Sequence, residues 1–258
     1  MQDLSYKEKQ DSLKVRIRAH KEFANYDIAD WIEVYLARKP RRRILDLGCG
    51  NGNHLGLYLK HVGAQGIVCG IDREKSLIEE ARSAHAAFLN VSLEVGSMDA
   101  PLPYGDGSFD TCFSNFSIYN AREPERTLRE LRRVLQPGGE LVLIGPTANN
   151  AKEIYVFNER LTGVAIDPVT LVRTDRLRQE ILPVAKKVFK NVTEEVINSY
   201  LTFPDQDEFL LYYRSTMLFE EGAAKKGYSP EQMKAACTAE KRIVLSKEML
   251  ALIAIKET

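Results

Sequence analysis

The sequence predicts a doubly wound α/β protein: a mostly parallel seven-stranded sheet with helices on both faces, an antiparallel last strand and an inserted helical lid. Two observations predict this fold class. From about residue 40 to 147, short apolar or β-branched runs alternate with segments whose apolar residues recur at helical spacing, which is typical of βαβ units. Later, the run MLALIAIK follows a helical segment near the end of the sequence, which fits an antiparallel edge strand.

Residues 1–39 predict a helical cover for the sheet edge or its ligand, with one or two helices between Leu13 and Ala37. The core, residues 40–147, should contain five strands, at Arg43–Leu47, Gly66–Ile71, Val91–Val95, Phe109–Phe113 and Glu140–Ile144. Helical spacing between these strands predicts helices over Asn53–Val62, Glu74–Phe88 and Pro124–Leu135.

Residues 148–190 are helix-rich and predict the lid, over the carboxyl edge of the sheet, where open α/β sheets bind ligands. Residues 191–258 should complete the sheet. They predict strands over Val192–Phe203 and Met249–Lys256, with helices over Gln206–Phe219 and Pro230–Lys241 between them.

The charge, apolar runs and cysteine spacing of the sequence limit which partners and ligands the chain is expected to bind. The 258 residues contain 36 Lys plus Arg and 36 Asp plus Glu, so no overall basic field indicates nucleic acid. No apolar run has the length of a signal peptide or membrane span, so we expect a cytoplasmic protein. The four cysteines lack CxxC spacing, which favours reduced buried thiols and no metal site. The sequence leaves open whether the chain is a monomer or a homodimer.

The most informative segment is ILDLGCGNGNH, residues 44–54, in which a strand runs into a glycine-rich turn that opens a helix. Closely spaced glycines let the backbone approach a ligand without intervening side chains. Asp72 ends the next predicted strand, where a carboxylate is placed to accept both hydroxyls of a ribose. The combination predicts a nucleotide-like ligand.

Two further segments extend this pattern: GSMDAPLPYGDGSFD at residues 96–110 and RELRRVLQPGGEL at residues 129–141. In order and spacing, the chain over about residues 40–147 resembles the class I S-adenosylmethionine-dependent methyltransferases of the type 11 branch. A nicotinamide dehydrogenase would share the strand, turn and acidic residue, but it expects GxGxxG where this loop has Gly48-x-Gly50-x-Gly52. It would also leave the other two segments unexplained.

The resemblance implies S-adenosylmethionine as the cofactor and assigns residues to each part of it. It places Asp46 and the backbone of Gly48 and Gly50 at the methionine end, Asp72 at the ribose hydroxyls, Met98 and Asp99 at the adenine, and Ser114 and Asn115 beside the sulfonium. Cys49 and Arg73, which adjoin these residues, are also expected to bind the cofactor. Carboxylates suit the ammonium, ribose and amine donors of such a ligand. On the leading helix, Arg16, Arg18 and Tyr26 are candidates for the methionine carboxylate.

Methyl transfer is an in-line displacement at an already activated carbon, so the protein mainly aligns the reactants and, for some acceptors, removes a proton. Tyr119 is the best candidate for positioning the acceptor, and His54 is either a base or a solvent-facing residue of the first helical turn. Other residues expected to face the acceptor are Ser117, Asn120, Tyr155, Tyr200, Tyr212, Tyr213 and Arg214.

The implied function is methyl transfer to a small molecule with an O, N or activated C nucleophile. Two alternatives stay open: a protein or tRNA substrate, and a non-catalytic module that binds the cofactor. After the fourth strand, Ser114-Asn115-Phe116-Ser117 lacks the Pro-Pro-aromatic sequence of amino-methylating DNA enzymes, which weakens base methylation. The arginines of residues 122–135 alternate with glutamates, so we expect an ion-paired helix face there.

Overall fold

The computed structural model describes residues 10–165, 172, 174–237 and 242–257. Over these residues it confirms the predicted fold class, with a seven-stranded sheet in the order β3-β2-β1-β4-β5-β7-β6. The strands are β1 (Arg43–Leu47), β2 (Ile67–Asp72), β3 (Val91–Val95), β4 (Phe109–Asn115), β5 (Leu135–Pro146), β6 (Asn191–Phe203) and β7 (Ile243–Ile255).

The strand order reverses at β1, which pairs in parallel with β2 on one side and with β4 on the other. The crevice outside the carboxyl ends of β1 and β4 is therefore the topological switch point, where sheets of this kind bind ligands. β7 runs antiparallel to both of its neighbours, β5 and β6. This pairing confirms the antiparallel last strand.

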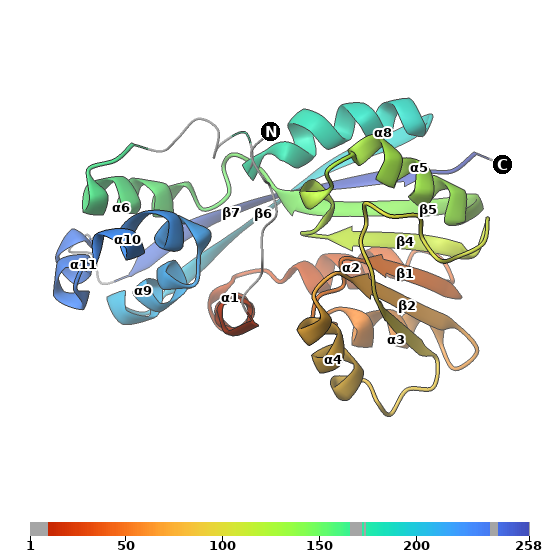
Figure 1. Ribbon diagram of the computed structural model, residues 1–258, viewed down its shortest axis with the longest axis horizontal. Helices are drawn as coiled ribbons and strands as arrows, with labels where there is room; N and C mark the ends of the chain where they lie inside the picture. The colour runs from red at the N-terminus through yellow and green to blue at the C-terminus, as the bar shows by residue number, and fades with distance from the viewer. Residues whose placement is uncertain (1–9, 166–171, 173, 238–241, 258) are drawn as a thin grey trace.

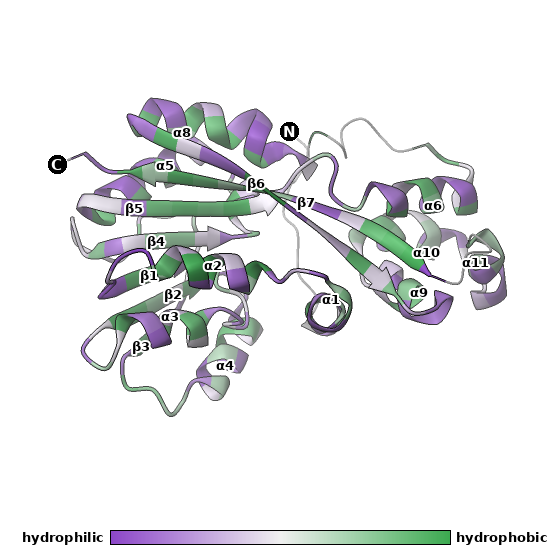
Figure 2. Cartoon of the chain, turned by 180° about the vertical axis from the view of Figure 1, so that it is seen from behind, coloured by the Kyte–Doolittle hydropathy of each residue, from purple (hydrophilic) through white to green (hydrophobic). Residues whose placement is uncertain are grey.

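Helices cover both faces of the parallel part of the sheet (Figure 1). One face packs against α2 (Ile28–Leu36), α3 (Leu55–Val62) and α4 (Lys75–Ala84), and the other against α5 (Pro124–Val134), the π-helical turn η2 (Leu177–Ile181) and α8 (Leu182–Val188). The Asp27 carboxylate caps α2 by accepting a hydrogen bond from the Ala29 amide at 2.9 Å. Figure 2 shows hydrophobic residues on the central strands and hydrophilic residues on the outward turns of α5 and α8.

A second lobe surrounds the far ends of β6 and β7 (Figure 1). Its apolar cluster joins residues of these strand ends to residues of the neighbouring helices. The helical segments of this lobe are α6 (Lys152–Thr162), α9 (Gln206–Arg214), η3 (Phe219–Ala223), α10 (Ala224–Lys226) and α11 (Pro230–Ala236). β6 and β7 pair without interruption from Asn191↔Ile255 to Phe203↔Ile243, so they connect the lobe to the main sheet.

The leading helix α1 (Gln10–Phe23) lies between the two lobes (Figure 1). Ala19 packs into the apolar cluster of the second lobe. Arg18 forms an ion pair with Glu208 of α9, and Lys14 lies 3.6 Å from Glu80 of α4. These contacts hold α1 across the mouth of the switch-point crevice.

The sequence predicted one lid over residues 148–190, but the described helices of this segment lie in two different places. Within residues 148–190, α6 packs into the second lobe, whereas η2 and α8 pack against the sheet beside α5. The helices between β6 and β7 supply the rest of the lobe. The end of the helix expected over Pro230–Lys241 lies outside the described residues. Nowhere in the described ranges does a helix combine the length and apolarity needed to cross a membrane.

Candidate cofactor and acceptor site

The glycine loop adopts a conformation that side chains rarely adopt. Gly48, Gly50 and Gly52 have φ angles of 78°, 56° and 81°. A Cβ added to Gly48 would lie 2.3 Å from Ser117 Cβ, whereas one added to Gly50 would meet no atom within 4 Å. Gly48 therefore allows the loop to pack on the segment after β4, and Gly50 borders open space where a ligand could approach.

Asp72 holds the glycine loop against the next helix. One carboxylate oxygen accepts a hydrogen bond from the Gly50 amide at 2.8 Å, and the other accepts one from the Glu74 amide at 2.9 Å. Each oxygen retains a lone pair for a ligand hydroxyl. Arg73 follows Asp72 in the chain, and its Nε lies 3.6 Å from a Glu74 carboxylate oxygen.

Asp46 is a buried carboxyl group with an unused acceptor. It is 2% exposed, and its Oδ1 is enclosed without a hydrogen-bond partner in the described part of the chain. Burial, with a contribution from the negative charge of Asp72, raises the pKa of Asp46 to about 7. The same burial and the charges of both aspartates raise the pKa of the Cys49 thiol, which stays protonated. A cation bound beside Asp46 would supply the missing partner.

A second unused acceptor lies at the end of β4. Asn115 donates through Nδ2 to the Tyr58 hydroxyl oxygen at 2.7 Å, while its Oδ1 is enclosed and accepts no hydrogen bond from any described residue. The Tyr58 ring stacks on Phe113 with centroids 4.8 Å apart, which fixes the hydroxyl. Tyr58 was not predicted at the site, since in the sequence it appears only as one apolar position of α3.

His54 lies beside this pair. Its ring centroid is 6.4 Å from that of Tyr58, and its Nε2 is enclosed with no hydrogen-bond partner within the described ranges. Burial lowers the pKa of His54 to about 4, against a smaller opposing effect of Asp27. The imidazole is therefore neutral at physiological pH, the state in which it accepts a proton.

The segment after β4 is fixed by two serines. The hydroxyls of Ser114 and Ser117 both donate to the Leu47 carbonyl, at 2.9 and 2.7 Å, and lie 2.5 Å from each other. Ser114 thus uses its hydroxyl within the protein. Between them, Phe116 has a φ of 53° and is 37% exposed. A left-handed aromatic residue at the switch point is a strained feature that no sequence signal indicated.

Met98 and Asp99 lie on a turn that α5 supports. Thr127 donates to the Met98 carbonyl at 3.0 Å, and the Arg122 amide donates to Asp99 Oδ1 at 2.7 Å. The Met98 Cε atom would lie 3.6 Å from a Cβ on Gly48, so this side chain reaches the glycine loop. Asp99 stands at the rim, with one oxygen engaged by the backbone.

Tyr119 lies at the carboxyl end of β5, the strand next to β4 in the sheet. A Cβ on Gly145 would lie 3.1 Å from its ring, and its carbonyl accepts a hydrogen bond from Arg176 at 2.6 Å. It therefore borders the crevice from the side opposite Asp72. Of the other expected acceptor residues, Tyr213 is buried and donates to Asn158 at 2.6 Å, whereas Tyr200 is exposed on β6.

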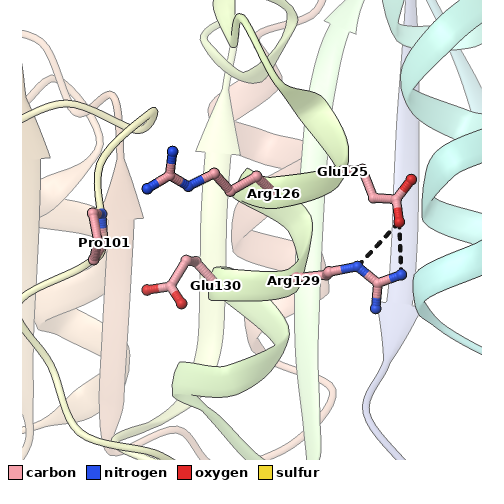
Figure 3. A pocket seen from close by; sticks show the side chains of 5 residues that line it. All are labelled: Pro101, Glu125, Arg126, Arg129 and Glu130. Atoms are coloured by element: carbon pink, nitrogen blue, oxygen red, sulfur yellow. Dashed lines mark hydrogen bonds and ion pairs between the residues drawn. The ribbon is translucent and has the colours of Figure 1, made fainter.

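Two surface grooves flank this crevice. The first, of about 490 Å³, runs between α1 and the glycine loop, and its lining includes Ile17, Asn51 and His85. In the second, of about 440 Å³, Arg126 and Glu130 point towards Pro101 while Glu125 and Arg129 pair with each other on the other side of α5 (Figure 3). The second groove contains none of the predicted site residues. The ion pair between Glu125 and Arg129 confirms the ion-paired face expected for α5.

Two arginines of α1 are engaged by α9 or by the residue that follows it. Arg16 donates a hydrogen bond to the Ser215 carbonyl and Arg18 pairs with Glu208. In the described part of the chain, no three His, Cys, Asp or Glu side chains are grouped so as to hold a metal ion. The site thus brings together Asp46, Asp72, Gly48, Gly50, Met98, Asn115 and His54, with Arg73, Asp99 and Tyr119 at its margins.

A family model described as a methyltransferase domain matches residues 38–196. The ubiquinone/menaquinone biosynthesis C-methyltransferase of Roseobacter denitrificans is 30% identical over 193 residues, which cover 72% of this chain and 68% of that protein. An uncharacterised 37.1 kDa protein in transposon TN4556 of Streptomyces fradiae is 39% identical over 111 residues, covering 43% of this chain and only 32% of that protein. The structure of the YcgJ protein from Bacillus subtilis shares the fold, with a TM-score of 0.61, 17% identity and coverage of 89% of this chain and 98% of that one.

Proposed function

Because the chain belongs to the methyltransferase-domain family, we propose that it transfers the methyl group of S-adenosylmethionine to a small-molecule acceptor. One observation carries the proposal: two enclosed acceptor atoms at the carboxyl ends of β1 and β4, Asp46 Oδ1 and Asn115 Oδ1, have no hydrogen-bond partner among the residues that the structure describes. Buried polar atoms are rarely left unpaired without a ligand or water. Both atoms suit a ligand rich in N–H and O–H donors.

The residues present fit this cofactor. The Asp46 carboxylate would hold the ammonium of the methionine part, and the free lone pairs of Asp72 would accept ribose hydroxyls. The open space at Gly50 lets the ligand lie against the loop backbone. When bound, the cofactor supplies a methyl group on positively charged sulfur.

The chain's own residues then align the acceptor and exclude water. Tyr119 positions the acceptor from the β5 side of the crevice, and the exposed ring of Phe116 packs against it. His54, neutral at physiological pH, is the proposed proton acceptor. Its lowered pKa makes it a weak base, which suits an acceptor whose proton is already acidic.

The acceptor is proposed to be an aromatic or apolar small molecule. The name of the Roseobacter relative, a quinone-biosynthesis C-methyltransferase, supports this class. The balanced charge of the chain and the ion pairing of the α5 arginines favour a small molecule over nucleic acid. The cytoplasmic location expected from the sequence stays a prediction.

The test is a transfer assay with methyl-labelled S-adenosylmethionine and three substrate pools: reduced naphthoquinones lacking the ring methyl, bulk tRNA, and mixed protein. We expect label in the quinol pool, lost in Asp72→Ala and retained in Asp207→Ala, whose carboxylate is 73% exposed. Label only in tRNA or protein would contradict the proposed acceptor class. Cofactor binding without transfer to any pool would indicate a non-catalytic module.

A further inference from the structure

Tyr58 of α3 is a buried residue whose hydroxyl lies against the end of β4. Its side chain is sealed from solvent, with 0% exposure. Its ring stacks on that of Phe113, with centroids 4.8 Å apart and an angle of 22° between the planes. The Phe113 ring is itself met edge-on by Tyr35, at 6.1 Å between centroids. Close packing of this kind holds a side chain in place, so α3 and β4 together fix the Tyr58 hydroxyl.

The hydroxyl of Tyr58 orients the Asn115 amide. Asn115 is 8% exposed, and its Nδ2 donates to the Tyr58 oxygen at 2.7 Å. An amide has its donor on one branch and its acceptor on the other, so this hydrogen bond turns Oδ1 away from the hydroxyl. Oδ1 is enclosed and accepts no hydrogen bond from any residue that the structure describes. The group left for a ligand is therefore the carbonyl oxygen, not the NH2 group.

The negative charge of Asp46 explains why the hydroxyl acts as the acceptor. Burial, reinforced by the charge of Asp46, raises the pKa of Tyr58, so the hydroxyl stays protonated. A negative charge nearby attracts the hydroxyl hydrogen, which leaves a lone pair of the oxygen for the Asn115 amide. In Tyr58→Phe the amide would lose this partner and would be free to turn its NH2 group towards the ligand.

Asp46 and Asn115 lie on the same face of the sheet. In the parallel pairing of β1 with β4, Asp46 lies opposite Phe113, and the alternation of side chains places Asn115, two residues further on, on that face as well. Their backbone positions are then roughly 8 Å apart. Oδ1 of Asp46 is the other enclosed acceptor that no described residue pairs with. Two such acceptors suit a ligand with two positive centres, and with the ammonium of S-adenosylmethionine at Asp46, Asn115 is left for its sulfonium.

We propose that Tyr58 is a positioning residue that presents the Asn115 carbonyl oxygen to the positively charged sulfur of the cofactor. The inference deepens the proposed function and rests on it for the identity of the ligand. A fixed carbonyl dipole attracts a cation, whereas an amide NH2 group in its place would repel it. The sulfur becomes neutral when the methyl group leaves, so this attraction is lost in the product. The arrangement therefore favours S-adenosylmethionine over S-adenosylhomocysteine.

The test is calorimetric titration of the full chain with three ligands. S-adenosylmethionine and sinefungin carry a positive charge at the position of the sulfur group, and S-adenosylhomocysteine does not. Tyr58→Phe should weaken the two cationic ligands by at least about fivefold and S-adenosylhomocysteine by less than about twofold. Asn115→Leu should show the same selective loss. The double variant should lose no more than Asn115→Leu alone, because Tyr58 acts through Asn115.

Tyr35→Phe is the matched control. Tyr35 is 2% exposed, contacts the same Phe113 ring and donates its hydroxyl hydrogen bond to Glu140 at 2.5 Å. Glu140 pairs with Thr111, four residues before Asn115 on β4. This variant thus loses a buried tyrosine hydrogen bond that does not involve the Asn115 amide. We expect it to lower stability and to leave all three affinities within about twofold of the wild type.

Equal weakening of all three ligands in Tyr58→Phe, or no weakening, would overturn the inference. A double variant that binds the cationic ligands more weakly than Asn115→Leu would also overturn it. If Tyr58→Phe does not fold, Asn115→Leu still decides, because equal losses there would show that the carbonyl oxygen does not face the charged sulfur. Wild-type chain that binds none of the three ligands would refute the proposed function, whereas wild-type binding with unselective losses in the variants would refute this inference alone.

Discussion

Gly48 and Gly50 share a left-handed conformation but differ in what surrounds them. Gly48→Ala would force a Cβ to 2.3 Å from Ser117 in addition to backbone strain, so we expect a loss of about 2–4 kcal/mol in the free energy of unfolding. Gly50→Ala meets open space, so its loss should be about 1 kcal/mol. Urea denaturation measures both.

Gly50→Ala, the less destabilised of the two variants, should nevertheless lose affinity for the ligand. The Cβ added at Gly50 enters the space proposed for the cofactor, so Gly50→Ala should weaken S-adenosylhomocysteine binding by roughly tenfold or more although the protein stays folded. A Gly50→Ala variant that binds as the wild type does would show that the ligand does not approach this part of the loop.

The raised pKa of Asp46 should make the free energy of unfolding depend on pH. Its pKa is about 7 in the folded chain against an ordinary value of 3.8. Between these values the folded state holds a proton that the unfolded state has released, so this residue's contribution makes the protein less stable as pH rises from 4 to 7. Asp46→Asn should therefore stabilise the ligand-free protein at pH 8 by roughly 2–4 kcal/mol, measured by urea denaturation.

The affinity for S-adenosylhomocysteine should also depend on the protonation of Asp46, but it should rise as the pH rises. The ligand ammonium would bind the ionised form of Asp46, so affinity for S-adenosylhomocysteine should fall by up to about tenfold per pH unit below pH 7. Asp46→Asn should bind more weakly and without this slope. A wild-type affinity that is constant from pH 5 to 8 would contradict the assignment of Asp46 to the ammonium.

At this scale the sequence predicted the glycine loop and Asp72, because a strand, turn and helix are adjacent in the chain. It did not predict Tyr58. Tyr58 reaches Asn115 only because α3 packs across the sheet onto β4, which is a long-range contact.

Among the elements, the short parallel strands were predicted best. β1 and β3 have the predicted bounds, since each is an apolar or β-branched run closed by turn residues. β7 begins at Ile243, not at Met249. Ser246, Lys247 and Glu248 interrupt its apolar run, and pairing with the full length of β6 overrides this local polarity. Likewise, the packing of α8 beside α5 depends on contacts across the sheet.

α1 is the element most suited to respond to the ligand. Figure 2 shows it as largely hydrophilic, and polar contacts to Glu80 and Glu208 hold it over the glycine loop. Exposed ion pairs contribute little, so the first turns of α1, before the buried Ala19, should open readily in the ligand-free protein. Hydrogen exchange should show at least about tenfold slower exchange of α1 amides with S-adenosylhomocysteine, while α5 is unchanged. Equal exchange in both states would show that α1 does not cover the ligand.

For the whole molecule, the continuous β6–β7 pairing determines how the two lobes behave. Thirteen residue pairs run from the main sheet into the second lobe, whose apolar cluster includes both strand ends. The lobes should therefore unfold together. Calorimetry should show a single transition with equal calorimetric and van't Hoff enthalpies. Two separated transitions would show that the second lobe folds as an independent unit.

In the proposed function, the switch-point crevice binds S-adenosylmethionine through Asp72 and the glycine loop. Calorimetric titration of wild type, Asp72→Ala and Asp207→Ala with S-adenosylhomocysteine, with NADH as a competing ligand, tests this binding. We predict saturable binding to wild type and Asp207→Ala, at least about 100-fold weaker binding to Asp72→Ala, and no displacement by NADH. Absence of S-adenosylhomocysteine binding to the folded wild type, or tighter binding of NADH, would contradict the account.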